Sequence, residues 1–317
     1  MRCLVQRRWL LPVLPPRARP AAGRVNASRC DLARGAQAVG ANSATRSISG
    51  GLLPGCSLDI DMVAFPQTGV MIRPGTLELL ELLEQAVREG AEVIGGLDPV
   101  GVDRDPKGQL DGIFAIAGRH GCEVDIHLHD RGDLGAVTIE MIAERTRSLG
   151  LKGKVAISHA FCLGGLEPAR LESLIGLLLD NDIAIMTHAP AGATPFPPIR
   201  LLHDRGVRLF SGSDGIRDTW SPLNNGDMLA RAFLLAYRSG FRDDADIELA
   251  LRMATYGGAQ VMGLAHYGLT VGSSADLVLV AAETAAEAVA YHPPRRLVLK
   301  RGRVVARDGQ SLLPNID

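Results

Sequence analysis

Polar residues end four successive apolar runs of this sequence, and the spacing between them is regular. The runs end at His127, His159, His188 and Asp214, with gaps of 32, 29 and 26 residues. Each gap fits one strand, one helix and two loops, so the pattern predicts consecutive βα units and a parallel sheet. In a (β/α)₈ barrel the carboxyl ends of such strands surround the active site. We therefore predict an α/β fold of the TIM-barrel type with its chemistry at this edge of the sheet.

Composition is consistent with an enzyme of this class and excludes several others. Of 317 residues, 46% are hydrophobic and 4% aromatic, which suits a large α/β domain. No apolar run approaches the roughly 18 residues of a membrane span, so no membrane partner is expected. Residues 1–50 hold nine arginines and one acid, whereas the remainder holds 25 bases and 34 acids. That acidic remainder argues against a nucleic-acid partner. The partner expected for an enzyme of this class is a small-molecule substrate.

The five cysteines contain no Cys-x-x-Cys pair, so neither a zinc ribbon nor a redox pair is predicted. The same absence excludes the small zinc deaminases that hold their metal with a Pro-Cys-x-x-Cys segment. A cytoplasmic location is the default expectation. The oligomeric state is left open, a homo-oligomer included.

Regular alternation of strands and helices begins near Leu58. Strands are expected over residues 59–65, 91–97, 123–128, 154–158, 182–187 and 207–212. Helices are expected over 76–89, 110–119, 136–148, 167–179, 197–205, 226–239 and 246–262. Segments 268–280 and 296–306 alternate like strands of a small antiparallel sheet, with a turn at Arg301-Gly302. We predict a barrel over 57–266 and a β appendage over 267–317.

Residues 1–56 differ from the rest because they are rich in arginine and lack apolar periodicity. A secretory signal fits poorly, since the apolar run Leu10–Leu14 is short and contains Pro12. An organelle transit peptide fits better. The interpretation we favour is a disordered or non-native segment that arose from a misplaced start or a frame shift.

Histidine and carboxylate ligands suit Zn²⁺ or Fe²⁺ with one coordination position open to water. A bound divalent ion would lower the pKa of that water toward about 7, and a base would then carry its proton to the leaving nitrogen. We assign His127 and Asp214 as metal ligands and Asp130 as the proton shuttle. His159 is placed to polarise the reacting carbonyl or orient the hydroxide.

For several other residues, a role in the site competes with a purely structural role. His129 shares a strand face with His127, and its role is open between site and structure. His188 is interpreted as a core residue rather than a ligand. Gln67 and Trp220 are predicted to contact substrate, although Trp220 could equally be core. Asp133 and Glu140 compete with Asp130, and Asp98 and Asp103 could line the mouth.

The chain resembles the amidohydrolase superfamily, specifically its cytosine deaminase-like branch. The resemblance rests on Val63-Ala-Phe-Pro-Gln67, Val124-Asp-Ile-His127, Ser158-His159, Ser213-Asp214 and the segment from Gly268 to Leu279. It implies a metal held by the fifth-strand His127 and the eighth-strand Asp214, with His159 on the sixth strand and Gln67 on the substrate. The family's glutamate three residues after the fifth-strand histidine is Asp130 here. A second aspartate of cytosine deaminases is replaced by Gly215.

The resemblance also implies a first-strand His-x-His that this sequence does not contain, because no histidine precedes His120. By the family's strand order, residues 59–65 are strand three. We therefore expect a barrel that lacks its first two strands. The predicted function is metal-dependent hydrolysis of a non-peptide C–N bond in a small cyclic amidine, amide or ureide. The alternative is a non-catalytic barrel remnant.

Overall fold

A computed structural model describes residues 2–4, 61–71, 76–217, 222–223 and 225–313 of the protein. The chain divides into two compact units. The described part of the first unit comprises 2–4, 61–71 and 76–209, and that of the second comprises 210–217, 222–223 and 225–313. Each unit is described by itself below.

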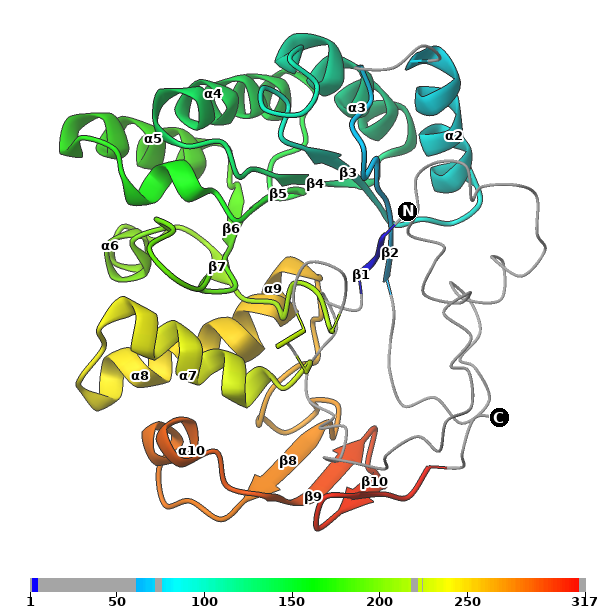
Figure 1. The fold of residues 1–317 in the computed structure, drawn as a ribbon. Helices are drawn as coiled ribbons and strands as arrows, with labels where there is room; N and C mark the ends of the chain where they lie inside the picture. Colours follow the sequence, from blue (N-terminus) through cyan, green and yellow to red (C-terminus); the bar gives the residue numbers. More distant parts are fainter. Residues whose placement is uncertain (1, 5–60, 72–75, 218–221, 224, 314–317) are drawn as a thin grey trace. The chain divides into compact units, whose positions relative to one another are not determined.

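The first unit alternates strands and helices along the chain (Figure 1). Its strands are β1 (Arg2–Leu4), β2 (Asp61–Ala64), β3 (Val93–Leu97), β4 (Glu123–His127), β5 (Val155–Ser158), β6 (Ala184–Met186) and β7 (Leu209–Phe210), the last of which ends at the boundary with the second unit. Its helices are α2 (Thr76–Arg88), α3 (Pro106–His120), α4 (Gly132–Ser148), the 3₁₀ turn η4 (Phe161–Gly164), α5 (Pro168–Asp180) and α6 (Ile199–Asp204).

The strands form one sheet in the order of the sequence, β1 to β7. Strands β2 to β6 pair in parallel, whereas β1 pairs antiparallel with β2. Every residue of β2, β5 and β6 is buried, as expected for parallel strands covered on both faces. The sheet and its crossover helices confirm the predicted α/β class. The alternation of strands and helices also confirms that the gaps between His127, His159, His188 and Asp214 correspond to βα units.

Two helix starts were predicted four residues too late. Helix α3 begins at Pro106 rather than Leu110, because Asp105 accepts the Gly108 N–H at 2.8 Å and Pro106 occupies the first turn. Helix α4 begins at Gly132 rather than residue 136. The preceding Arg131 makes no side-chain cap, so the sequence carries no capping signal there.

The second unit contains helices and a separate antiparallel sheet. Its helices are α7 (Met228–Ser239), α8 (Asp244–Arg252), the π-helical turn η5 (Met253–Gly257), α9 (Gly258–Val261) and α10 (Ala285–Tyr291). Its strands are β8 (Leu277–Val280), β9 (Arg295–Lys300), β10 (Arg303–Arg307) and β11 (Gln310–Ser311). The apolar side chains of Val298, Val305 and Ala306 form the core of this sheet.

The small C-terminal antiparallel sheet confirms the predicted β appendage, whereas one strand and one helix predicted for this unit need correction. Arg301 and Gly302 form the tight turn between β9 and β10 with positive φ angles of 51° and 77°, as predicted. The first predicted strand is wrong over 268–276, because only Leu277–Val280 is extended and paired. The single helix predicted over 246–262 is interrupted by the π-helical turn η5.

The predicted domain limits at residues 56, 266 and 317 remain predictions. Apart from β1, residues 1–56 lie outside the described part of the chain. Among the described helices, none has both the length and the apolar character needed to cross a membrane.

Candidate metal centre and active site

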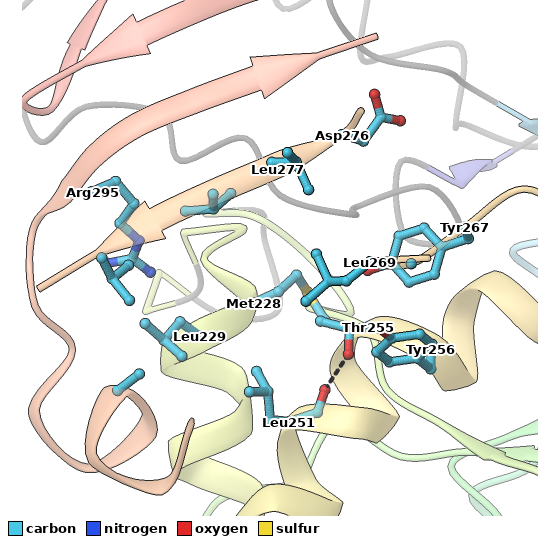
Figure 2. Close-up of a pocket in the computed structure, with 14 residues that line it drawn as sticks. Met228, Leu229, Leu251, Thr255, Tyr256, Tyr267, Leu269, Asp276, Leu277 and Arg295 are labelled. Atoms are coloured by element: carbon cyan, nitrogen blue, oxygen red, sulfur yellow. Dashed lines mark hydrogen bonds between the residues drawn. The ribbon is translucent and has the colours of Figure 1, made fainter. Parts of the chain in front are cut away.

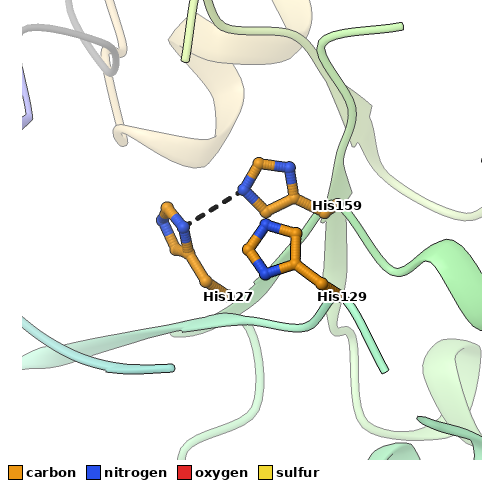
Figure 3. Close-up of side chains that lie close together, drawn as sticks. All are labelled: His127, His129 and His159. Carbon is orange, nitrogen blue, oxygen red and sulfur yellow. Dashed lines mark hydrogen bonds between the residues drawn. The ribbon is translucent and has the colours of Figure 1, made fainter. Parts of the chain in front are cut away.

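Four histidines gather at the carboxyl ends of β4, β5 and β6. His127 is the last residue of β4, His129 lies two residues beyond it, His159 follows β5, and His188 lies two residues after β6. The parallel register pairs His127 with Ser158 and Ser158 with Met186, so these strand ends lie at the same level of the sheet. Figure 3 shows three of the imidazole rings turned toward one another.

Two pairs of imidazole nitrogens each lie about as far apart as two ligands of a single metal ion. The pairs use opposite nitrogens of His159, so one ion can bind only one of these two nitrogens. His127 Nδ1 is 3.1 Å from His159 Nε2, and His159 Nδ1 is 3.2 Å from His188 Nδ1. One ring nitrogen from each of His127, His129 and His159 lies within 4.8 Å of the other two. Two nitrogens at about 2.0–2.1 Å from a zinc ion in tetrahedral geometry stand about 3.3 Å apart. The residues present therefore fit a divalent ion, and without one the same rings can hydrogen-bond to each other.

Asp98 holds His129 with both carboxylate oxygens. Its Oδ1 accepts the His129 backbone N–H at 2.6 Å, and its Oδ2 lies 2.9 Å from His129 Nδ1. A proton on Nδ1 would point at this carboxylate and leave the Nε2 lone pair available. Metal-binding histidines commonly have such a carboxylate partner. The arrangement equally suits a histidine that transfers protons.

Two buried phenylalanines border the histidine cluster. The Phe65 ring lies 4.8 Å from the His127 ring, and the Phe161 ring lies 5.3 Å from His129 and 5.6 Å from His159. Both side chains are buried, as are His127 and His159. Apolar walls of this kind exclude water and strengthen electrostatic interactions inside the site.

The backbone adopts an uncommon conformation where several of these strands end. Positive φ angles occur at Asp98 (36°), His159 (75°), Ala189 (54°) and Asp214 (64°), which follow β3, β5, β6 and β7 respectively. Non-glycine residues rarely adopt such angles, and those that do concentrate at functional sites. At His159 and Asp214 this conformation occurs in the predicted site residues themselves.

Asp130 and Gln67 lie on loops of the same unit. The Asp130 carboxylate is half-buried and accepts the Gly101 N–H at 3.3 Å. Burial, followed by the negative charge of Asp98, raises the pKa of Asp130 above its ordinary value. Gln67 is half-buried in the turn after β2, where its backbone N–H donates to the backbone carbonyl of Phe65 at 3.1 Å. The described contacts of Asp130 are with the loop after β3, and its role as shuttle stays a prediction.

Asp214 belongs to the second unit, where it follows the buried Ser213. Arg231 of α7 donates to Ser213 O at 3.1 Å. Burial lowers the pKa of Arg231 to about 10, and the negative charge of Asp214 opposes this shift. Asp214 as a metal ligand remains a prediction. Trp220 lies outside the described residues.

The second unit also contains a cavity of about 250 Å³ beside β8 (Figure 2). Its lining is mostly apolar, and its charged groups have partners: Arg295 pairs with Asp227, and Asp276 binds Lys300 at 2.6 Å. Thr255 donates its hydroxyl to Leu251 O at 2.7 Å. Among the described residues that line this cavity, none is a predicted site residue. It therefore offers no chemistry comparable with that of the histidine cluster.

Comparison with known proteins assigns the chain to a family. The Amidohydrolase family profile matches residues 66–306, a range that includes all four clustered histidines. The chain belongs to the amidohydrolase family. This confirms the predicted resemblance, although it does not assign individual site residues.

Among characterised relatives of this amidohydrolase is N-isopropylammelide isopropyl amidohydrolase of Pseudomonas sp. (strain ADP), 33% identical over 252 residues that make up 79% of this chain and 62% of the relative. The crystal structure of N-isopropylammelide isopropylaminohydrolase from Burkholderia multivorans ATCC 17616 superposes with a TM-score of 0.76 at 46% identity, covering 80% of this chain and 64% of that one. The 5-methylcytosine deaminase from Klebsiella pneumoniae liganded with phosphonocytosine gives a TM-score of 0.70 at 26% identity, covering 78% and 63%. The chain thus spans less than two thirds of the length of each of these proteins.

The structure brings His127 and His159 together, as the sequence predicted, and adds residues that the sequence ranked lower. His188 contacts His159 although it was interpreted as core, and Asp98 contacts His129. The position of His188 directly after an apolar run was a usable signal. Asp98 and His129 were each named as candidates, but their pairing was not predicted, because it depends on the conformation of the loops after β3 and β4.

Proposed function

We propose that the protein is a metal-dependent hydrolase of a non-peptide C–N bond in a small nitrogen heterocycle. The observation that carries this proposal is the cluster of histidines at the carboxyl edge of a parallel sheet, in a chain of the amidohydrolase family. Imidazole and carboxylate ligands suit Zn²⁺ or Fe²⁺. When bound, such an ion supplies a water of lowered pKa and polarises a carbonyl or amidine.

In this proposal His127 and Asp214 hold the metal, and His129 or His188 completes the ligand set. His159 lies between His127 and His188, with one ring nitrogen directed at each. From that position it can hold or release a proton next to the reacting carbon and orient the substrate. Gln67 and Trp220 are proposed to bind substrate. The amide of Gln67 can donate and accept together, which suits a cyclic amide or ureide.

Two groups compete for the proton transfer to the leaving nitrogen. Asp130 has a raised pKa, caused first by burial, which favours a carboxyl that can carry a proton. His129 contacts His159 with ring centroids 4.2 Å apart and is anchored by Asp98. If His129 is not a metal ligand, this anchored imidazole can relay protons between the cluster and solvent.

The substrate class follows from the site and from the names of the relatives. The relatives are named for N-isopropylammelide and 5-methylcytosine, which are nitrogen heterocycles. The rings of Phe65 and Phe161 beside the histidines suit a flat ring of this kind. We therefore propose a planar cyclic amidine, amide or ureide as substrate, with release of an amine or ammonia.

The test is turnover by the full chain, stripped with a chelator and reloaded with Zn²⁺ or Fe²⁺. N-isopropylammelide and 5-methylcytosine serve as probes, and the released amine or ammonia is measured. We expect turnover only after reloading, and a loss of at least about 10³-fold in His127→Ala. His203→Ala, which changes an exposed histidine of α6, is the matched control. Turnover that survives chelation, or that persists in His127→Ala, would refute the proposal.

The alternative is a barrel remnant that does not catalyse. One observation favours it, namely that no histidine precedes His120 in this sequence. Metal affinity depends on the number and geometry of ligands, so fewer ligands would weaken binding. A full chain that reaches no metal occupancy and turns over neither probe would support this alternative.

A further inference from the structure

We propose that Asp103, which lies outside the histidine cluster, is a positioning residue for substrate binding. It holds the loop that carries Gln67 against the loop that carries Asp98. This inference rests on the proposed function, because it concerns the substrate affinity of the same site.

The Asp103 carboxylate is buried and fastens the loop after β2. The Val70 N–H lies 2.8 Å from its Oδ1 and 2.9 Å from its Oδ2, so one backbone donor is shared between both oxygens. Gln67 lies within the turn 66–69, which the Gly69 N–H closes by donating to Pro66 O at 3.0 Å, and Val70 directly follows this turn. Only 4% of the Asp103 surface is exposed. Solvent therefore screens these bonds weakly.

The same carboxylate is tied to the end of β3. Gln109 of α3 donates its amide Nε2 to Asp103 Oδ2 at 2.7 Å and to Leu97 O at 3.0 Å. The Asp98 carbonyl accepts the Val102 N–H at 2.9 Å and the Asp103 N–H at 3.4 Å. Asp103 thus joins the Gln67 loop to the segment that places the carboxylate of Asp98 on His129.

Gly69 leaves room for this contact. Its φ of +83° is a conformation that glycine adopts without strain. A Cβ at this position would overlap Asp103 Oδ1 and would stand 2.9 Å from Val102 Cγ1. The approach of loop and carboxylate therefore requires glycine at residue 69.

Chemistry explains why a carboxylate occupies this interior position. Its partners among the described residues are donors from the backbone of one loop and from an amide side chain. A buried carboxylate is costly unless several donors satisfy it, and a well-packed apolar residue would serve stability equally well. Holding two loops in one relative position is a role that an apolar residue could not fill, because it offers no acceptor to Val70.

Asp103→Asn is the sharpest test because it keeps the shape and removes one acceptor. In either orientation of the asparagine amide its NH₂ group faces a donor. At the Oδ1 position it faces the Val70 N–H, and at the Oδ2 position it faces both the Val70 N–H and Gln109 Nε2. Gly69→Ala perturbs the same contact from the other side. Asp105→Asn is the matched control, since Asp105 is exposed, caps α3 and leaves an equally good cap as asparagine.

We expect Asp103→Asn and Gly69→Ala to raise KM for N-isopropylammelide or 5-methylcytosine by about tenfold while kcat changes by less than about threefold. Gln67→Ala should raise KM, and adding Asp103→Asn to it should have little further effect, since both act through one loop. Amide hydrogen exchange at Val70 should speed up at least about tenfold in Asp103→Asn and stay unchanged in Asp105→Asn.

The outcomes separate this inference from the proposed function. Wild-type chain without turnover of either probe refutes the proposed function, whereas the exchange of Val70 still reports whether Asp103 holds the loop. Unchanged exchange at Val70 overturns the positioning role. Faster exchange together with unchanged KM, or fully additive effects with Gln67→Ala, also overturns it, because Asp103 would then be structural only.

Discussion

Replacing Asp98 by asparagine should weaken metal binding if His129 is a ligand. The two carboxylate oxygens of Asp98 each face one nitrogen of His129, the backbone N–H at 2.6 Å and Nδ1 at 2.9 Å. Asparagine has one acceptor oxygen, so one of the two nitrogens would face an NH₂ group. His129 would then lose either its backbone anchor or the partner that fixes its ring.

The expected size of the effect follows from this contact. Removing the carboxylate partner of a metal-binding histidine typically lowers metal affinity about 10–100-fold, and this corresponds to about 1.4–2.8 kcal/mol. The His129 side chain is 38% exposed, so water can replace part of the lost contact. We therefore expect a decrease of about tenfold, at the lower end of this range.

Competition of the purified protein with a chromophoric chelator for Zn²⁺ measures the effect. Asp133→Asn, which changes an exposed carboxylate in the first turn of α4, is the matched control. An affinity within about twofold of wild type in Asp98→Asn would show that His129 is not a ligand. A loss of kcat with unchanged affinity would instead assign His129 to proton transfer.

Three further predictions concern the surroundings of the site. Asp130→Asn should lower kcat by about 10²–10⁴-fold without changing metal affinity. Because the folded pKa of Asp130 is raised, its charged form opposes folding, so the variant should gain thermal stability at pH 7. This gain should be lost as the pH falls through the folded pKa and should be absent below the unfolded value near 4. Burial raises the pKa of Cys162 to about 12, so its thiol should react slowly in the native protein. Mass spectrometry after treatment with a thiol reagent should find Cys162 unmodified in native protein and modified in urea. Rapid modification of Cys162 in the native protein would contradict its burial. Gly164→Ala should destabilise the protein by about 1–3 kcal/mol in urea titrations, because its Cβ would overlap the Phe196 backbone. Gly176→Ala on α5 is the control: its Cβ meets no atom within 4 Å, so it should stabilise the protein by about 0.5–1 kcal/mol. Equal effects of the two substitutions on the free energy of unfolding would refute the contact between Gly164 and Phe196.

Sequence periodicity predicted the sheet because parallel strands buried on both faces read as short apolar runs. Strands such as Val155–Ser158 and Glu123–His127 were placed to within one or two residues. Helix starts were less predictable. The Asp105-Pro106 start of α3 was a readable signal that apolar periodicity alone missed. The start of α4 has no side-chain cap and is marked only by Asp133 in its first turn.

The candidate site was predictable where the signal was local. A polar residue directly after an apolar run, such as His127 or His159, marks a strand end, and strand register places those ends together. The contacts of Asp98 with His129 and of Asp103 with Val70 join residues 31 and 33 positions apart. Such contacts depend on loop conformation, which periodicity does not encode.

The metal content of the full chain tests the central claim most directly. After dialysis against Zn²⁺ and removal of free ion, plasma emission spectrometry should find about one equivalent in wild type and in the exposed-histidine variant His203→Ala, and far less in His127→Ala. Wild-type content below about a tenth of an equivalent, or equal content in His127→Ala, would mean that the histidines at these strand ends do not form a metal centre.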